Sequence, residues 1–285
     1  LVLADIPASW YLVLVLVLLQ GSSFGATWAE GARDAPLEVL FHLDFENGFV
    51  AAKAKGEAKP TNDNLPELVE GVHGKAARFA QGKALRYLEP GNLRNERGAV
   101  AMWVQTPAKG ISLDDRDWLT LLREDSDRAS RNFLWFWLWT NEVYGGLRFD
   151  FQDGKYDVLH SALAWGKGEW HHVVVNWDCA SGRSVYLDGE SASRGGGDDR
   201  KGFIPISWPV KTTHPAFFVG AFDATGTSPW TGAIDEVKIF GRPLTDAEIR
   251  AEFSRFRRVT VRAINPYLYA GGRATCRVAF KDLHA

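Results

Sequence analysis

The chain has 285 residues, of which 46% are hydrophobic and 24% charged, and its formal net charge is -2. This composition is typical of a globular protein with a hydrophobic core, and the near-neutral charge argues against nucleic acid or an anionic membrane as a partner. The length allows one large β-sandwich with extra segments, or two small domains. Neither Cys-x-x-Cys nor His-Glu-x-x-His occurs, so we expect no zinc site.

The first distinct segment is an unbroken apolar run from Trp10 to Leu19. The run is shorter than the ~20 residues that a membrane-spanning helix needs, and small residues follow it, so residues 1–29 are expected to be a signal peptide. Asp5 precedes the run where Lys or Arg is usual, and the chain begins with Leu rather than Met. A buried strand and an uncleaved anchor are the alternatives. We expect a secreted or cell-surface protein.

The next segments alternate between apolar and polar residues, as half-buried strands do. From Glu38 to Phe45, the side chains of Val39, Phe41 and Leu43 share one face. Further strands are expected at residues 74–79, 84–88, 98–106, 118–122, 133–140, 147–151, 156–159, 170–177, 185–187, 217–222 and 232–240. Many short strands separated by turns predict an all-β sandwich.

The strand expected at residues 133–140 is the most aromatic segment. Trp135, Trp137 and Trp139 share one face, and apolar residues also fill the other face. An aromatic ring can stack on a pyranose while polar neighbours bond its hydroxyls, so these three Trp residues, with Asn141 and Tyr144, are the candidate carbohydrate-binding residues. The alternative is that the Trp residues pack in the core or under loops. Other candidate contacts are Trp165, Trp208 and Trp230.

Two local signals lie further along the chain. Asp188-Gly189 predicts a tight hairpin turn. Thr245 and Glu248 have the spacing of a capping box and predict a short helix. Ile249 lies on the side of that helix expected to pack on the sandwich.

The closing strand, residues 232–240, contains two adjacent carboxylates. If it alternates regularly, Asp235 shares the buried face with Val237 and Ile239, and Glu236 points to solvent. An inward carboxylate is costly unless something pairs with it. We therefore expect a cation, hydrogen-bond donors or a basic side chain against Asp235.

Several segments together carry a family resemblance. They are His42-Leu-Asp-Phe-Glu-Asn-Gly48, Gly74-Lys-Ala-Ala-Arg-Phe79, Val100-Ala-Met-Trp-Val104, Trp170-His-His-Val-Val-Val-Asn-Trp-Asp178 with Val185-Tyr-Leu-Asp-Gly189, and Gly232 to Phe253. In this order they resemble laminin-G-like, concanavalin A-like jelly-roll domains. The resemblance spans residues 37–256 and implies a concanavalin A-like antiparallel β-sandwich with one short C-terminal helix.

The resemblance also implies a structural calcium ion on the convex side of the sandwich. Asp235 occupies the position of a typical ligand, with carbonyl groups from the opening strand, and Asp44 and Glu46 are nearby candidates. Calcium prefers six to eight oxygen ligands. The alternative is that Asp235 pairs with backbone amides or with an arginine such as Arg78.

Catalytic signals are weak. The Glu-x-Asp-x-x-Glu strand used by some glucan hydrolases of this fold is absent. Glu124 to Asp127 is interpreted as a solvated turn, Asp198-Asp199 as part of a Gly-rich loop, and His171-His172 as framework of a strand.

The sequence therefore favours a non-catalytic carbohydrate-binding or cell-surface recognition module of a larger, bacterial-type secreted protein. Its expected partners are a polysaccharide or glycoconjugate and further domains of the same polypeptide. Residues 257–285 are expected to begin a second β module. The alternatives are a catalytic glycoside hydrolase or lyase domain and a protein–protein adhesion module.

Overall fold

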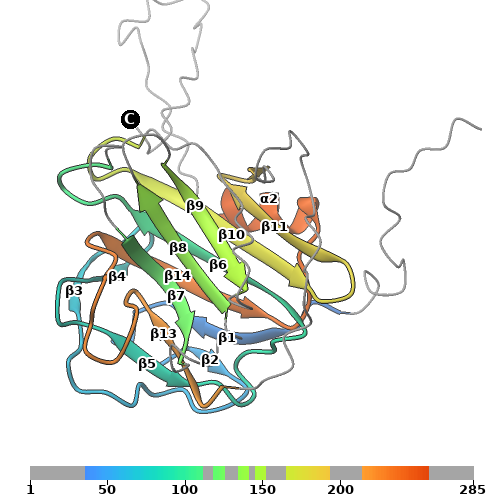
Figure 1. The fold of residues 1–285 in the computed structure, drawn as a ribbon, viewed down its shortest axis with the longest axis horizontal. Helices are drawn as coiled ribbons and strands as arrows, with labels where there is room; N and C mark the ends of the chain where they lie inside the picture. The colour runs from blue at the N-terminus through green and yellow to red at the C-terminus, as the bar shows by residue number, and fades with distance from the viewer. Residues whose placement is uncertain are drawn as a thin grey trace, which may run out of the picture. The chain divides into compact units, whose positions relative to one another are not determined.

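The computed structural model describes residues 36–111, 118–125, 134–140, 145–151, 165–192 and 214–256. These residues form two antiparallel sheets and one helix, α2 (Asp246–Arg255) (Figure 1). The predicted β-sandwich with a short helix near the end is confirmed. The segments expected to be a signal peptide (1–29) and a second module (257–285) lie outside the described residues.

The larger sheet has nine strands. Seven lie in the order β12 (Glu190–Ser191), β11 (Gly182–Leu187), β10 (Trp170–Asp178), β6 (Arg97–Gln105), β14 (Ala233–Phe240), β1 (Val39–Leu43) and β2 (Lys53–Ala54). The remaining two, β3 (Glu67–Glu70) and β4 (Lys75–Arg78), form a hairpin that pairs with β14. The closing strand β14 thus lies between the opening strand β1 and β6, near the middle of the sheet.

The smaller sheet has five strands, in the order β5 (Leu85–Leu88), β13 (Ala216–Val219), β7 (Trp118–Glu124), β8 (Leu134–Thr140) and β9 (Gly145–Phe151). The strand expected at 156–159 lies outside the described residues. The strand expected at 217–222 ends earlier, because Gly220 has a φ of +73° and the chain turns there.

One hydrophobic core lies between the two sheets. It contains Phe41 and Met102 from the larger sheet and Phe136 and Phe217 from the smaller one, all 0% exposed. Alternate side chains of β6 and β10 enter this core. In β1 a register shift between Val39 and Phe41 interrupts the alternation, and Val39 packs against a different apolar cluster, so the prediction that it shares one face with Phe41 and Leu43 is wrong. We call the opposite side of each sheet its outer face, and the candidate site residues lie on these two faces.

Both predicted local motifs are present. Asp188 and Gly189 have φ of +50° and +84° and connect β11 to β12, as expected for a hairpin turn whose two central residues have positive φ. The Thr245 side chain accepts the Glu248 N–H, and the Glu248 carboxylate accepts the Thr245 N–H, which completes the capping box of α2. Among the described residues, no helix is both long and apolar enough to cross a membrane.

Candidate functional site

The closing strand carries an irregularity that changes the direction of its two carboxylates. Asp235 lies opposite Trp103 on β6, but Lys238 lies opposite Ala101, so β14 has one extra residue between these pairs. Glu236 occupies this β-bulge with a φ of +50°. Ile234 and Val237 both face the core. The regular alternation that we expected is therefore wrong, because one inserted residue moves the preceding side chains to the opposite face.

Asp235 therefore lies on the outer face of the larger sheet, opposite to the core face on which Val237 and Ile239 lie. Its burial is confirmed, since it is 0% exposed. One oxygen accepts the His73 N–H (3.1 Å) and the other the Glu236 N–H (2.7 Å). Burial raises the pKa of Asp235 to about 8; the two N–H donors oppose this rise, and the negative charge of Glu236 adds to it.

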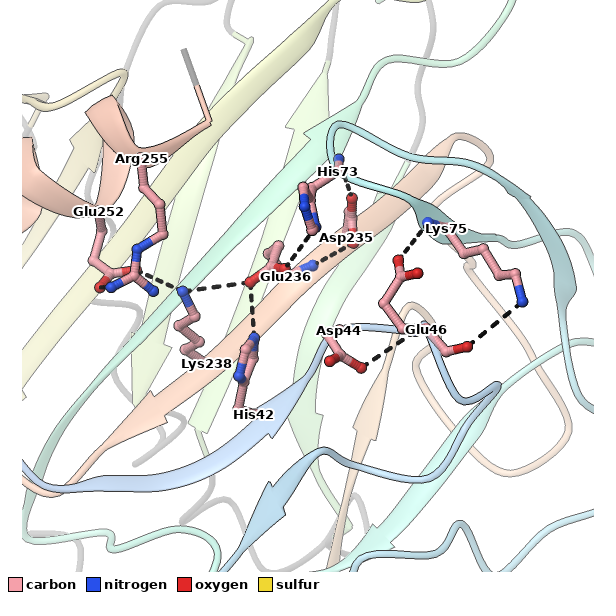
Figure 2. A network of polar contacts seen from close by, with 10 residues as sticks. All are labelled: His42, Asp44, Glu46, His73, Lys75, Asp235, Glu236, Lys238, Glu252 and Arg255. Atoms are coloured by element: carbon pink, nitrogen blue, oxygen red, sulfur yellow. Dashed lines mark hydrogen bonds and ion pairs between the residues drawn. The ribbon is translucent and has the colours of Figure 1, made fainter. Parts of the chain in front are cut away.

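The prediction that Glu236 points to solvent is wrong, because this carboxylate is only 5% exposed. It accepts a hydrogen bond from His42 Nε2 (2.7 Å) and lies 3.4 Å from Lys238 Nζ. Lys238 in turn bonds Glu252 of α2 at 2.7 Å (Figure 2). Burial disfavours the charge of Glu236, but the bonds from His42 and Lys238 outweigh it and lower the pKa of Glu236.

Asp44 and Glu46, the other two predicted calcium ligands, lie just after β1. Asp44 accepts the Glu46 N–H at 3.2 Å, and Glu46 accepts the Lys75 N–H at 2.7 Å. Figure 2 shows Asp235 bonded to His73 and Glu46 bonded to Lys75, the residues on either side of Gly74 where the turn between β3 and β4 ends. Gly74 of this turn has a φ of +58°, and a Cβ there would collide with the Glu46 carboxylate.

These contacts bear on whether the three carboxylates suit a cation. Within the part of the chain that the structure describes, no group of three or more His, Cys, Asp or Glu side chains is arranged to hold a metal ion. Asp235 nevertheless offers what a hard cation requires, a buried carboxylate whose charge the two N–H donors do not neutralise. Calcium at this position stays a prediction.

Helix α2 covers another part of the same outer face. Ile249 packs with Val174, Tyr186 and Phe240 in a second apolar cluster. Phe253 stacks on Trp103, with ring centroids 5.7 Å apart. His172, 2% exposed, lies beside these rings, and burial lowers its pKa to about 3. The neutral, enclosed imidazole agrees with the interpretation of His172 as framework.

The outer face of the smaller sheet is aromatic. Trp135 and Trp137 stack with centroids 4.2 Å apart, but they are only 5% and 4% exposed. Trp118 on the neighbouring strand β7 lies 5.6 Å from Trp137 and is 53% exposed. Trp118 is the most exposed of the large apolar side chains that the structure describes. Sequence reasoning overlooked it, since only the pairing of β7 with β8 brings it beside the other two.

Polar groups flank this aromatic face along the segment between β13 and β14. Thr120 forms a parallel bridge with Pro229, and its N–H donates to Ser228 O at 3.0 Å. Phe222 packs edge-on against Trp135 at 5.0 Å. Ser228 and Thr227 are partly exposed. The strand of the exposed indole is thus joined, two residues after Trp118, to a segment that carries the hydroxyls of Thr227 and Ser228, and sugar recognition combines an aromatic ring with such polar groups.

The remaining predicted contacts divide into two groups. Asn141, Tyr144, the Trp139 side chain and Trp208 lie outside the described residues. Trp165 and Trp230 are 6% and 0% exposed and belong to the core between the sheets, so their assignment as exposed rim contacts is wrong.

The structure also contradicts the interpretation of Glu124 as part of a solvated turn. It is the last residue of β7 and is 0% exposed, so it does not belong to a solvated turn. Its carboxylate accepts the Leu134 N–H at 2.6 Å. Asp125 beside it is partly exposed and pairs with Arg86 at 2.9 Å. Residues 126 and 127 lie outside the described residues, as do Asp198 and Asp199.

Comparisons with known proteins agree with this architecture. Domain 4 of AbnA, a GH43 extracellular arabinanase from Geobacillus stearothermophilus solved with arabinotriose, is similar with a TM-score of 0.56 and 19% identity, over 75% of this chain and 98% of that one. The binding domain of Paraclostridial Mosquitocidal Protein 1 is similar with a TM-score of 0.55 and 13% identity, over 78% of this chain and 53% of that one. The binding domain of botulinum neurotoxin serotype G is similar with a TM-score of 0.56 and 10% identity, over 79% of this chain and 53% of that one.

At these identities the similar structures establish the fold alone, and the chain spans about half the length of the two toxin domains. No curated protein sequence matches the chain. The model of one family, the concanavalin A-like lectin/glucanases superfamily, matches residues 81–250, which is more than half of the chain. The protein therefore belongs to the concanavalin A-like lectin/glucanases superfamily.

Proposed function

We propose that this protein is a non-catalytic carbohydrate-binding module whose ligand stacks on Trp118. The exposure of this indole on the outer face of the smaller sheet is the observation that carries the proposal, because it leaves a large apolar ring for a ligand to cover. The rings of Trp135 and Trp137 contact it, with centroids 6.3 and 5.6 Å from that of Trp118. The ligand would be a polysaccharide or glycoconjugate, as in the similar arabinanase domain, which was solved with arabinotriose.

Burial argues against two carboxylate pairs as the catalytic groups of a glycoside hydrolase, the alternative function. Such enzymes need two carboxyl groups that flank the bond to be cleaved. Asp235 with Glu236 and Glu89 with Glu124 are two such neighbouring pairs, and each of these four carboxylates is 5% exposed or less. A glycosidic bond cannot reach either pair in this conformation.

A glycan array tests the proposal, with wild type, Trp118→Ala, Trp118→Phe and Leu68→Ala compared at equal concentration. Leu68 is a matched control because it is an exposed apolar residue on the other sheet, at 37% exposure. Removing the indole should weaken binding roughly tenfold to a hundredfold, and Phe should restore part of it. Binding by Trp118→Ala equal to wild type, or cleavage of a polysaccharide by the purified chain, would contradict the proposal.

We also propose a calcium ion held by Asp235 together with backbone carbonyls, with Asp44 or Glu46 as the next ligands. A cation there would neutralise a carboxylate that burial otherwise destabilises. Millimolar CaCl2 added after EDTA treatment should raise the melting temperature of wild type by a few degrees and leave Asp235→Asn unchanged. Equal melting temperatures of the wild type in CaCl2 and EDTA would contradict the proposal.

We also propose that the protein is exported, because the apolar run at residues 10–19 is typical of a signal peptide. Expression with this segment in a secreting host, followed by N-terminal sequencing, should find a product in the medium that begins between residues 24 and 30. Retention of the uncleaved chain in the cytoplasm would contradict it.

A further inference from the structure

Two buried carboxylates that the proposed function does not use lie at one end of the smaller sheet. Glu89 directly follows β5, and Glu124 ends β7. They are 1% and 0% exposed, although glutamate is almost never fully buried without a partner. An arrangement this costly suggests a role for the pair.

The two carboxylates bond to the backbone of neighbouring strands. Glu124 Oε2 accepts the N–H of Leu134, the first residue of β8, at 2.6 Å. Glu89 Oε1 accepts the N–H of His214, just before β13, at 3.1 Å, and the Glu89 N–H donates to Pro215 O at 3.2 Å. The pair therefore links the ends of four of the five strands, β5, β7, β8 and β13.

In the described part of the chain, the positive charges near the pair are those of Arg123, which favours ionisation of Glu124, and of His214 when its imidazole is protonated. His214 Nε2 lies 3.6 Å from Glu124 Oε2. The Arg123 guanidinium donates to Phe222 O on the outer face, and Arg86 pairs with Asp125. Among the described residues, the second oxygen of each carboxylate, Glu89 Oε2 and Glu124 Oε1, has no hydrogen-bond partner.

We propose that Glu89 and Glu124 form a proton-dependent latch, which holds these strand ends together while at least one carboxyl is protonated and loosens them when both ionise. Two buried negative charges repel each other, and a proton removes one of them. Burial raises the pKa of Glu89 to about 8, and burial together with the charge of Glu89 raises that of Glu124 well above its usual value. The latch does not depend on carbohydrate binding.

The sign of the pH effect follows from proton linkage. The folded state holds the proton more tightly than the unfolded chain, whose glutamates titrate near pH 4.3. The stabilisation is therefore complete at acidic pH and is lost as the pH rises toward about 8, the folded pKa of Glu89. Wild type should become less stable across the neutral range.

Melting temperatures of the full chain from pH 5 to 9 test the latch. Wild type should lose roughly 5–10 °C between pH 6 and 9, and Glu124→Gln or Glu89→Gln should lose clearly less, because one carboxylate can no longer ionise. Glu190→Gln, which removes a carboxylate that is 75% exposed, should follow wild type. Gln variants whose melting temperature falls as steeply as that of wild type would overturn the proposal.

A second measurement avoids the risk that the variants misfold. In wild type labelled with ¹³C only at the Glu carboxyl carbons, at least one resonance should titrate above pH 6.5, and the label excludes Asp235 from the signal. If every Glu carboxyl titrates below about pH 5.5, the latch does not exist.

Discussion

The outer faces of the two sheets use side chains in opposite ways. On the larger sheet, Glu236, Lys238 and Glu252 pair with one another, and α2 covers apolar residues beside them. On the smaller sheet, Trp118 lies beside two stacked Trp rings and keeps half of its surface in contact with solvent. On the larger sheet Lys238 pairs with both Glu236 and Glu252, whereas the smaller sheet leaves apolar area uncovered.

This difference separates residues that maintain the fold from residues that are available to a ligand. Breaking a buried ion pair is strongly destabilising, and charges that already have partners offer nothing to an external molecule. An exposed aromatic ring contributes little to folding and much to association. The two faces should therefore respond in opposite ways to mutation.

The largest effect is expected for Glu236→Ala. This change leaves Lys238 buried with a single partner, Glu252, and removes the bond from His42, so the free energy of unfolding should fall by about 3–5 kcal/mol. Urea denaturation measures it. Glu190→Ala, which breaks an exposed pair with Arg250, should cost less than about 1 kcal/mol. Equal costs for the two variants would remove the distinction between paired and exposed charges.

The second largest loss of stability is expected where α2 contacts the larger sheet. Phe253→Ala removes the ring that stacks on Trp103, and because Phe253 is half-buried the expected cost is about 1–3 kcal/mol. Hydrogen exchange should show faster opening of α2 than of β14. Unchanged protection of α2 would mean that the helix does not depend on this face.

The capping box is expected to matter less. Thr245→Ala removes the acceptor of the Glu248 N–H and should cost about 1 kcal/mol in thermal unfolding. Thr245→Ser keeps the hydroxyl and is the matched control. If Ser is as damaging as Ala, the threonine methyl group rather than the cap stabilises the helix.

Trp118→Ala should affect folding much less than the loss of a buried Trp, by about 1–2 kcal/mol, because the side chain is 53% exposed and only the remainder is buried. Trp137→Ala is the comparison, since this ring is 4% exposed and should cost about 3–5 kcal/mol. Calorimetry of both variants measures the contrast. A large loss for Trp118→Ala would assign this residue to the fold rather than to the binding face.

Regular patterns made the fold predictable from sequence. Alternation located β1 and β6, an aromatic run that is apolar on both faces located β8, and the segments of the family resemblance placed β1, β6 and β10 in one known order. The turn at Asp188-Gly189 and the capping box of α2 were also predicted correctly. These features are local, so the residues within a few positions contain the whole signal.

The candidate site depended on departures from regularity. The bulge at Glu236 reverses the face of Asp235, although Ile234 and Val237 hint at it, because a regular strand does not place its core residues three apart. The burial of Glu124 could not be foreseen, since Glu89 and His214, which enclose it, are distant in sequence.

The sequence by itself determined most of the longer strands, where the helix is capped and that the fold is a concanavalin A-like sandwich, because periodicity and turn chemistry act over short distances; the short strands β2, β3 and β12 were not predicted. Only the tertiary structure decided which carboxylates are paired and which tryptophan is exposed. Burial depends on what other strands place against a side chain, and Trp118, Trp135 and Trp137 have the same chemistry but different neighbours.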